Sequence, residues 1–153
     1  MKRWIFVLAF AFVLYGNGAA FVESFVNYPS WRLIGPDSFL DYHKFISPRV
    51  ITFLVVPAAL GTLFTIALLR FRPAAIPLWS VWAAIVLQVV VWVSTATIQV
   101  PIQMQLAVQG AVPALLERLI ETNWWLRRIP YALCAALFLW MATRAIAPRE
   151  REA

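Results

Sequence analysis

The chain has 153 residues, of which 63% are hydrophobic and 13% charged, and its mean hydropathy is +0.78. A soluble domain of this length is far less apolar, so the composition predicts one integral membrane domain, residues 1–153, and leaves no room for a separate soluble one. The single cysteine, Cys134, excludes an internal disulfide and a CxxC redox pair.

Four apolar stretches are each long enough to cross a bilayer as a helix, which takes about 20 residues. We expect spans at residues 4–27, 49–70, 74–100 and 123–147. The predicted fold is an all-α membrane protein: a four-transmembrane-helix bundle with an amphipathic lid segment between helices 1 and 2 and an amphipathic helix before helix 4.

The formal net charge of +6 indicates topology rather than nucleic-acid binding. If the chain crosses four times, one side carries Lys2, Arg3, Arg70, Arg72, Arg144, Arg149 and Arg151. The other side has basic residues that are offset by Glu23, Asp37, Asp41, Glu117 and Glu121. The positive-inside rule therefore predicts that both termini are cytoplasmic.

The first twenty residues have the basic start and apolar run of a signal peptide, but the apolar character continues to Val26, so we expect a retained first span. Gly16, Ala20, Glu23 and Asn27 recur at steps of four, three and four. Small residues let helices approach closely, and Glu23 is expected to point into the bundle.

Residues 28–47 form the expected lid, because Phe39, Tyr42, His43 and Ile46 follow at helical spacing. The alternative is an ordinary interfacial loop anchored by aromatic residues. Ser47 and Pro48 then predict the start of the second span, as N-cap and first helical residue. Arg49 would then lie in the first turn, where the positive end of the helix dipole disfavours a cation. We therefore expect a carboxylate to pair with Arg49, and Glu23 is the candidate.

The third span ends in a polar row. Gln88, Trp92, Thr95, Gln99 and Gln103 follow at steps of three and four and share one helix face, and Pro101 is expected to kink the helix there. Polar side chains in a membrane turn toward protein or a water-filled cavity, so we expect the row to line a pocket. The alternative is a set of interhelical hydrogen bonds that only holds the bundle together.

Pro113 opens an amphipathic helix, and Thr122 and Asn123 offer a cap for the last span. Pro130 leaves the start of that span open, because it either kinks a helix that begins at Asn123 or is itself the beginning.

Counting about 1.5 Å per residue along each helix brings polar side chains from all four spans to one depth. Glu23 is the candidate general base with His43 as proton partner, and Arg49 and Arg127 are candidates to stabilise an oxyanion. Alternatives are a structural ion pair for Glu23, a solvated interfacial histidine, and arginines that anchor lipid headgroups. The candidate substrate-binding residues are Asn27, Trp31, Tyr42, Trp92, Thr95, Gln99, Gln103, Asn123 and Trp124.

No cofactor is predicted. One histidine and one intramembrane glutamate cannot build a di-iron site or a bis-histidine haem site. A single metal held by Glu23 and His43 with amide help is an alternative.

Short motifs carry a resemblance to a family. They are an FxxYH element, a VPxxxxL element and a TNWxxR element, formed by Phe39, Tyr42 and His43, by Val100, Pro101 and Leu106, and by Thr122, Asn123, Trp124 and Arg127. The chain resembles the small bacterial membrane proteins related to the anthrone oxygenases. This implies a bacterial inner-membrane location and oxidation of a lipophilic, aromatic polyketide-like substrate without an obvious bound cofactor. The chain departs from the family at Gln103, where the family places a histidine.

Two functions follow. The first is a membrane-embedded enzyme that acts on a lipophilic small molecule, by cofactor-poor oxygenation or by acid–base isomerisation or cyclisation. The second is a non-catalytic lipid- or quinone-binding protein, or a small subunit of a membrane complex. The expected partners are a lipophilic small molecule and membrane lipids, with a homo-oligomer or a membrane partner subunit as further options and no nucleic acid.

Overall fold

The computed structural model describes residues 1–146, so position 147 of the predicted fourth span, Arg149 and Arg151 lie outside the described residues. The described chain folds into four long helices, Lys2–Leu33, Pro36–Phe71, Leu78–Gln109 and Pro113–Ile146. They contain 32, 36, 32 and 34 residues, and each is long and apolar enough to cross a membrane. This confirms the all-helical fold with four helices of membrane-spanning length, and it is compatible with an integral membrane protein.

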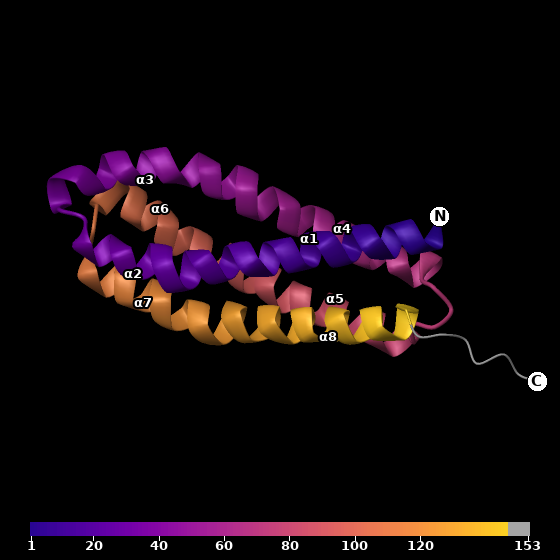
Figure 1. Cartoon of the computed structure of the whole chain (residues 1–153). Coiled ribbons are helices and arrows are strands. Elements are labelled where there is room, and N and C mark those ends of the chain that lie inside the picture. The colour runs from indigo at the N-terminus through magenta and orange to yellow at the C-terminus, as the bar shows by residue number, and fades with distance from the viewer. Residues whose placement is uncertain (147–153) are drawn as a thin grey trace, which may run out of the picture.

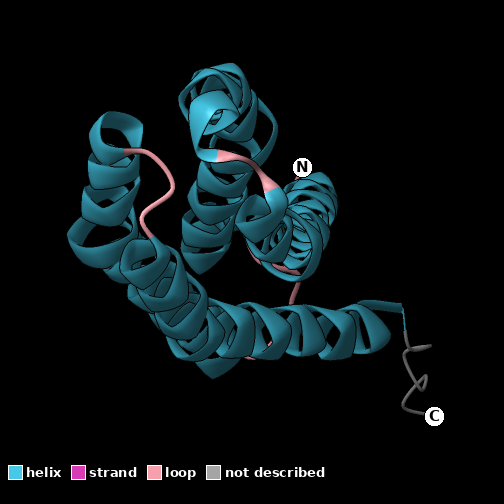
Figure 2. Ribbon diagram, turned by 90° about the vertical axis from the view of Figure 1, so that its left-hand side faces the viewer, coloured by secondary structure: helices cyan, strands magenta, loops and turns pink. Residues whose placement is uncertain are grey.

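The helices form an up-and-down ring in which neighbours in sequence are neighbours in space. The segment α1 (Lys2–Val22) packs against α4 (Val56–Phe71) and α8 (Ile129–Ile146), and α5 (Leu78–Ser94) packs against the same two helices. Short loops join the helices (Figure 2). Consequently α1 begins and α8 ends at the same end of the bundle (Figure 1).

Each long helix contains a π-helical segment that ends two residues before a proline. The segments are η1 (Glu23–Asn27), η3 (Ile51–Val55), η4 (Thr95–Gln99) and η5 (Trp124–Arg128), and the prolines are Pro29, Pro57, Pro101 and Pro130. A proline ring collides with the carbonyl group four residues earlier in a regular α-helix. The wider π turn relieves this, because the residue before the proline donates its N–H five residues back, as Tyr28 does to Glu23 and Val100 does to Thr95.

The helix boundaries differ from the expected ones. The second helix begins at Pro36 instead of near Pro48. Residues 28–33 of the predicted lid therefore end the first helix, and residues 36–47 lie in α3 (Pro36–Val50), the first part of the second helix. The hydroxyl of Ser47 donates to the carbonyl oxygen of His43 at 2.7 Å, as in a helix interior, and does not cap a helix start. The fourth helix begins at Pro113 and runs through Asn123 and Pro130, so neither residue begins it.

Two apolar cores lie on either side of the π segments. One core joins α1, α4, α5 and α8 and includes Phe6, Ala9, Leu68, Phe138 and Met141. The other core joins five segments that we together call the cap: α2 (Tyr28–Ser30), η2 (Trp31–Leu33), α3, α6 (Val100–Gln109) and α7 (Pro113–Asn123). This core includes Tyr28, Trp31, Phe39, Leu106 and Leu119. The polar side chains therefore meet between two separately packed regions.

Exposed tryptophans mark two levels of the bundle. Trp4, Trp79 and Trp82 are more than half exposed at the end where α1 begins, and Trp125 in η5 is 63% exposed. Tryptophan gathers at membrane–water interfaces. From Trp4 to Glu23 the helix rises roughly 30 Å, which is about the thickness of a bilayer's hydrocarbon core. The π segments thus lie about one hydrocarbon-core thickness away from the level of Trp4.

Candidate functional site

A cavity of about 300 Å³ lies at the level of the π segments, and we call it the polar cavity. All four long helices contribute to its wall. The predicted site residues that line it are Glu23, Trp31, His43, Thr95, Gln99, Gln103 and Arg127. Residues from four separate helices thus line one partly open cavity.

The polar cavity has an apolar side between the second and third helices. Its wall there includes Ile51 and Met104, which are 56% and 66% exposed to the outside of the bundle. Because these lining residues are also surface residues, the cavity opens sideways between these two helices. We call this opening the mouth.

Glu23 is the one carboxylate that lines the polar cavity. Glu23 is only 6% exposed, although it lies at the level where polar residues of all four long helices line the cavity. One carboxylate oxygen accepts a hydrogen bond from Nδ2 of Asn27 at 2.6 Å. The hydroxyl of Tyr42 in turn donates to Oδ1 of Asn27 at 3.3 Å. Asn27 and Tyr42, both predicted to bind substrate, therefore hold Glu23 in place instead of lining the cavity.

The expected ion pair between Glu23 and Arg49 is not formed. In the described part of the chain the one ion pair closer than 4 Å joins Arg32 and Glu117. Arg49 is exposed, donates to the carbonyl oxygen of Phe45 at 2.6 Å and stacks on the Phe45 ring. Since Arg49 lies inside a continuous helix and not in a first turn, the argument from the helix dipole does not apply to it.

Arg49 does lie near Glu23 on the outside of the bundle. Both residues line a separate, open groove of about 550 Å³ between the first and second helices, together with Tyr15, Gly18 and Phe53. The polar cavity does not include Arg49. The carboxylate of Glu23 thus lies in the wall between the groove and the cavity, and Arg49 shares with Glu23 the groove and not the polar cavity.

Arg127 is the cation of the polar cavity. Its side chain is 6% exposed, and Nη1 donates to the hydroxyl of Tyr28 at 3.5 Å. Its Nε is buried without a hydrogen-bond partner. Burying a charge is costly unless the charge is paired, so this guanidinium group is suited to bind an anionic or strongly polar oxygen.

Its neighbour Arg128 has different contacts. Arg128 donates to the carbonyl oxygen of Ser24 at 2.5 Å and lies over the rings of Phe25 and Trp124 at 4.3 and 4.9 Å. Trp124 itself is 42% exposed and packs edge-on against Phe25. Trp124 therefore belongs to the surface of the bundle and not to the polar cavity, contrary to its predicted role.

His43 is buried, with 5% of its surface exposed, and its ring nitrogens both have neighbours. Nε2 lies 2.8 Å from Oε1 of Gln103, so Nε2 carries the proton, and Nδ1 lies 3.4 Å from the hydroxyl of Ser47. The ring packs against Trp31 and Phe39. The alternative of a solvated interfacial histidine is thereby excluded.

The polar row of the third helix divides into two parts. Gln99 and Gln103 line the polar cavity, and Nε2 of Gln99 donates to Thr122 at 2.9 Å while its Oε1 is buried without a partner. Gln88 and Trp92 line a separate central pocket of about 20 Å³, which holds no more than a water molecule or two. The π segment η4 begins between the two parts, after Trp92 and at Thr95.

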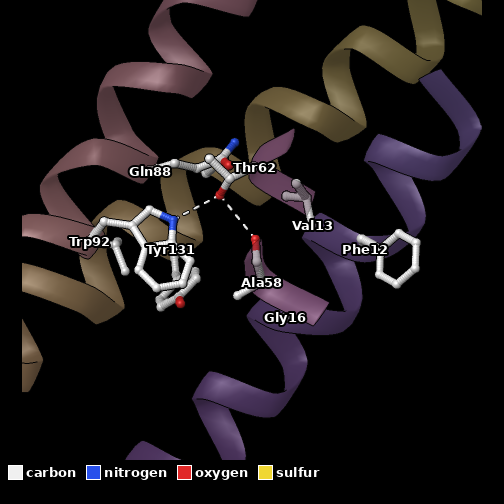
Figure 3. Close-up of a pocket in the computed structure, with 10 residues that line it drawn as sticks. Phe12, Val13, Gly16, Ala58, Thr62, Gln88, Trp92 and Tyr131 are labelled. Carbon is white, nitrogen blue, oxygen red and sulfur yellow. Dashed lines mark hydrogen bonds between the residues drawn. The ribbon is translucent and has the colours of Figure 1, made fainter. Parts of the chain in front are cut away.

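Interhelical hydrogen bonds lie at the central pocket. Nε1 of Trp92 donates to Oγ1 of Thr62 at 2.9 Å, and Figure 3 marks this bond with a dashed line. Nε2 of Gln88 donates to Oγ1 of Thr65 at 3.1 Å. Gln88 and Trp92 therefore form interhelical hydrogen bonds, as the alternative interpretation of the polar row expects. Trp92 does not line the polar cavity.

Asn123 also serves packing. It is 1% exposed and donates to the hydroxyl of Ser24 at 2.7 Å, which joins the fourth helix to the first.

Tyr28 and Ser47 line the polar cavity although they were not among the predicted site residues. The sequence signal for Ser47 is its position four residues after His43, on the same helix face. Tyr28 lies five residues after Glu23, a spacing that gives one face only across a π turn, so no sequence signal indicates it.

Among residues 1–146 no group of three or more histidine, cysteine, aspartate or glutamate side chains is placed to hold a metal ion. Comparisons of the chain with protein-family models, with curated proteins and with solved structures give no match. The function is therefore argued from the polar cavity itself.

Proposed function

We propose that this chain is a membrane-embedded enzyme that binds a lipophilic small molecule in the polar cavity and removes a proton from it. One observation carries the proposal: Glu23 and Arg127 come from the first and fourth helices, are both 6% exposed, and line the same cavity. A carboxylate and a guanidinium group held apart in one buried space can act on two ends of one polar head group.

The shape of the cavity supports a lipophilic ligand. Its volume of about 300 Å³ is at the lower end of the range for small-molecule sites. The mouth between Ile51 and Met104 is on the apolar flank of the bundle, where lipid would lie. A lipophilic molecule would enter from the bilayer, leave its apolar part at the mouth and bring its oxygen atoms to the polar end.

The chemistry that suits these groups begins with deprotonation. The carboxylate of Glu23 accepts a proton from a carbon next to a carbonyl group, or from a phenol, and the electron pair moves onto the oxygen of the substrate. The guanidinium group of Arg127 and the hydroxyl of Tyr28 donate hydrogen bonds to that enolate or phenolate oxygen. Returning the proton to a different carbon gives an isomerisation. In a cyclisation, the enolate carbon would instead attack a second carbonyl carbon of the same molecule, and the proton would return to the alkoxide oxygen that this attack forms.

The resemblance to anthrone oxygenases, which the comparisons leave untested, implies a different second step. The carbanion would form a carbon–oxygen bond with molecular oxygen, the co-reactant, and the resulting hydroperoxide would lose water and leave a carbonyl group at that carbon. Both routes share the first proton transfer to Glu23, so one measurement of that step tests either.

A second candidate is binding without turnover, and the contacts of His43 favour it. A histidine whose Nε2 and Nδ1 both face groups of its own chain, Gln103 and Ser47, is held as a structural residue would be. On this alternative Glu23 and Arg127 only hold the head group of a lipid or a quinone.

Hydrogen exchange on a probe substrate separates the two candidates. Purified protein in detergent, incubated in deuterium oxide with anthrone or with a lipophilic cyclic enone, is expected to speed the uptake of deuterium next to the carbonyl group. Glu23→Gln should lower that rate by a factor of about 100 or more, as for loss of a general base. Glu121→Gln, the same chemical change on an exposed face of α7, is the control.

No acceleration by the wild-type protein, with the probe demonstrably bound, would favour binding without turnover. Equal rates for the wild type and Glu23→Gln would show that Glu23 is not the base.

A further inference from the structure

A further large hollow is lined by residues from the start of α1 and the end of α8. Figure 1 shows that α1 begins and α8 ends at the end of the bundle opposite the cap. The hollow has a volume of about 1090 Å³, and we call it the basic groove. Lys2 and Arg3 from α1 and Arg144 from α8 line it. Its apolar walls include Phe6, Val7 and Phe10 of α1.

The described residues that line the basic groove carry charge of one sign. Within residues 1–146 they include three cations and no acidic residue. Within residues 1–146, no carboxylate lies within ion-pair distance of Lys2, Arg3 or Arg144. Cations of two helices from opposite ends of the chain thus converge above one apolar trough, and such an arrangement is complementary to an anion that carries a hydrocarbon chain.

The level of the groove suits a membrane surface. Trp4, in the first turns of α1, is 70% exposed, and Trp79, at the start of α5, is 59% exposed and packs against Trp140 with ring centroids 5.3 Å apart. Arg144 lies over the same Trp140 ring at 5.3 Å. Exposed tryptophans gather at the depth of lipid headgroups, so the three cations lie where phosphate groups are found.

We propose that the basic groove binds an anionic phospholipid of the leaflet at which α1 begins. The phosphate group contacts Lys2, Arg3 and Arg144, and one acyl chain lies along Phe6, Val7 and Phe10. Basic hollows between membrane helices bind anionic headgroups in this way. The proposal is independent of the polar cavity and of its proposed chemistry.

The test measures lipid selectivity of the full chain in a neutral detergent. Thermal stability and native mass spectrometry are followed during titration with phosphatidylglycerol and with phosphatidylcholine of the same acyl chains. Phosphatidylglycerol is expected to bind at much lower concentration. Each of Lys2→Gln, Arg3→Gln and Arg144→Gln should weaken its binding about fivefold, the factor that corresponds to about 1 kcal/mol per basic residue near an anionic lipid.

The matched control removes three positive charges elsewhere, by Lys44→Gln, Arg70→Gln and Arg118→Gln, and should keep the selectivity. The groove triple variant combines Lys2→Gln, Arg3→Gln and Arg144→Gln and should lose the selectivity. If both lipids bind the wild type alike, or if the control triple variant loses selectivity as much as the groove triple variant, the proposal is wrong. A second copy of the chain seated in the groove, with no selectivity among lipids, would also overturn it. The three single variants keep the test decisive should the triple variant fail to fold.

Discussion

Nε2 of His43 lies 2.8 Å from Oε1 of Gln103, although 60 residues separate them in the chain. The contact joins α3 to α6 and closes the cap end of the polar cavity, since both side chains line its wall. Gln103 continues toward Tyr28, whose hydroxyl lies 3.5 Å from its Nε2. Three of the four long helices are therefore connected through this one amide.

Gln103→Leu should destabilise the protein by about 1–3 kcal/mol, because the ring N–H of His43 would remain buried without an acceptor. Unfolding in detergent, followed by circular dichroism, measures this. Met104→Leu at the next position, on the exposed side of the mouth, is the control and should change stability by less than about 1 kcal/mol. Equal stability of Gln103→Leu and the wild type would show that the contact is not formed.

The closest approach of α1 and α4 is expected to depend on Gly61. A Cβ atom added there would meet the backbone of Phe12 and Val13 at 3.3 Å, whereas one added at Gly18 meets nothing within 4 Å. Gly61→Leu should therefore cost about 1–3 kcal/mol or more through overpacking, and Gly18→Leu should cost little. Thermal unfolding of the two variants compares them directly, and a larger loss for Gly18→Leu would contradict the packing of these helices.

Asn27 is expected to act through Glu23. Asn27→Ala removes the amide that donates to the carboxylate at 2.6 Å, so the carboxylate loses its fixed position. We expect deuterium uptake by the probe ketone to fall by about 10- to 100-fold with little loss of stability, as for a misplaced catalytic group. Tyr42→Phe, which removes the hydroxyl that supports Asn27, should show a smaller loss.

Tyr15→Phe serves as the control for these two variants, because Tyr15 is 50% exposed on α1. Exchange rates in Asn27→Ala that match those of Tyr15→Phe would show that Asn27 does not position Glu23.

Much of the fold follows from sequence patterns that have a direct physical cause. Four apolar stretches of spanning length predict four helices, and the described chain has them. The depth of Glu23, Gln99 and Arg127 follows from the rise per residue, because a helix converts residue number into height. This is why residues from different helices could be assigned to one level before any contact was known.

The helix boundaries could not be predicted because each depends on how a proline is accommodated. The expected first span ends at residue 27, before Pro29, and Pro48 is expected to begin the second span, yet both prolines lie inside continuous helices. At Pro29 the π segment η1 widens the helix and removes the collision that normally ends it. Nothing in the local sequence distinguishes such a proline from one that ends a helix.

The division of the polar residues was also beyond the sequence. Arg49 and Arg127 have the same chemistry and the same depth, but Arg49 faces the outer groove and Arg127 the polar cavity. Trp92 and Thr95 are three residues apart on one helix, yet they line different spaces because η4 begins between them. The direction of a side chain around the helix axis is set by packing and by the π turn.

The most direct test of the central claim is to measure whether a small molecule is retained in the polar cavity. Small molecules retained by the purified protein are identified by native mass spectrometry and by extraction, for the wild type and two variants. Ala107→Trp fills the cavity wall near the mouth. Val108→Trp is the control, because Val108 is 81% exposed and does not line the cavity. We predict that the wild type and Val108→Trp retain a lipophilic molecule other than phospholipid and that Ala107→Trp loses it. Retention by a folded Ala107→Trp equal to that of the wild type, or no such molecule in any of the three, would contradict the claim.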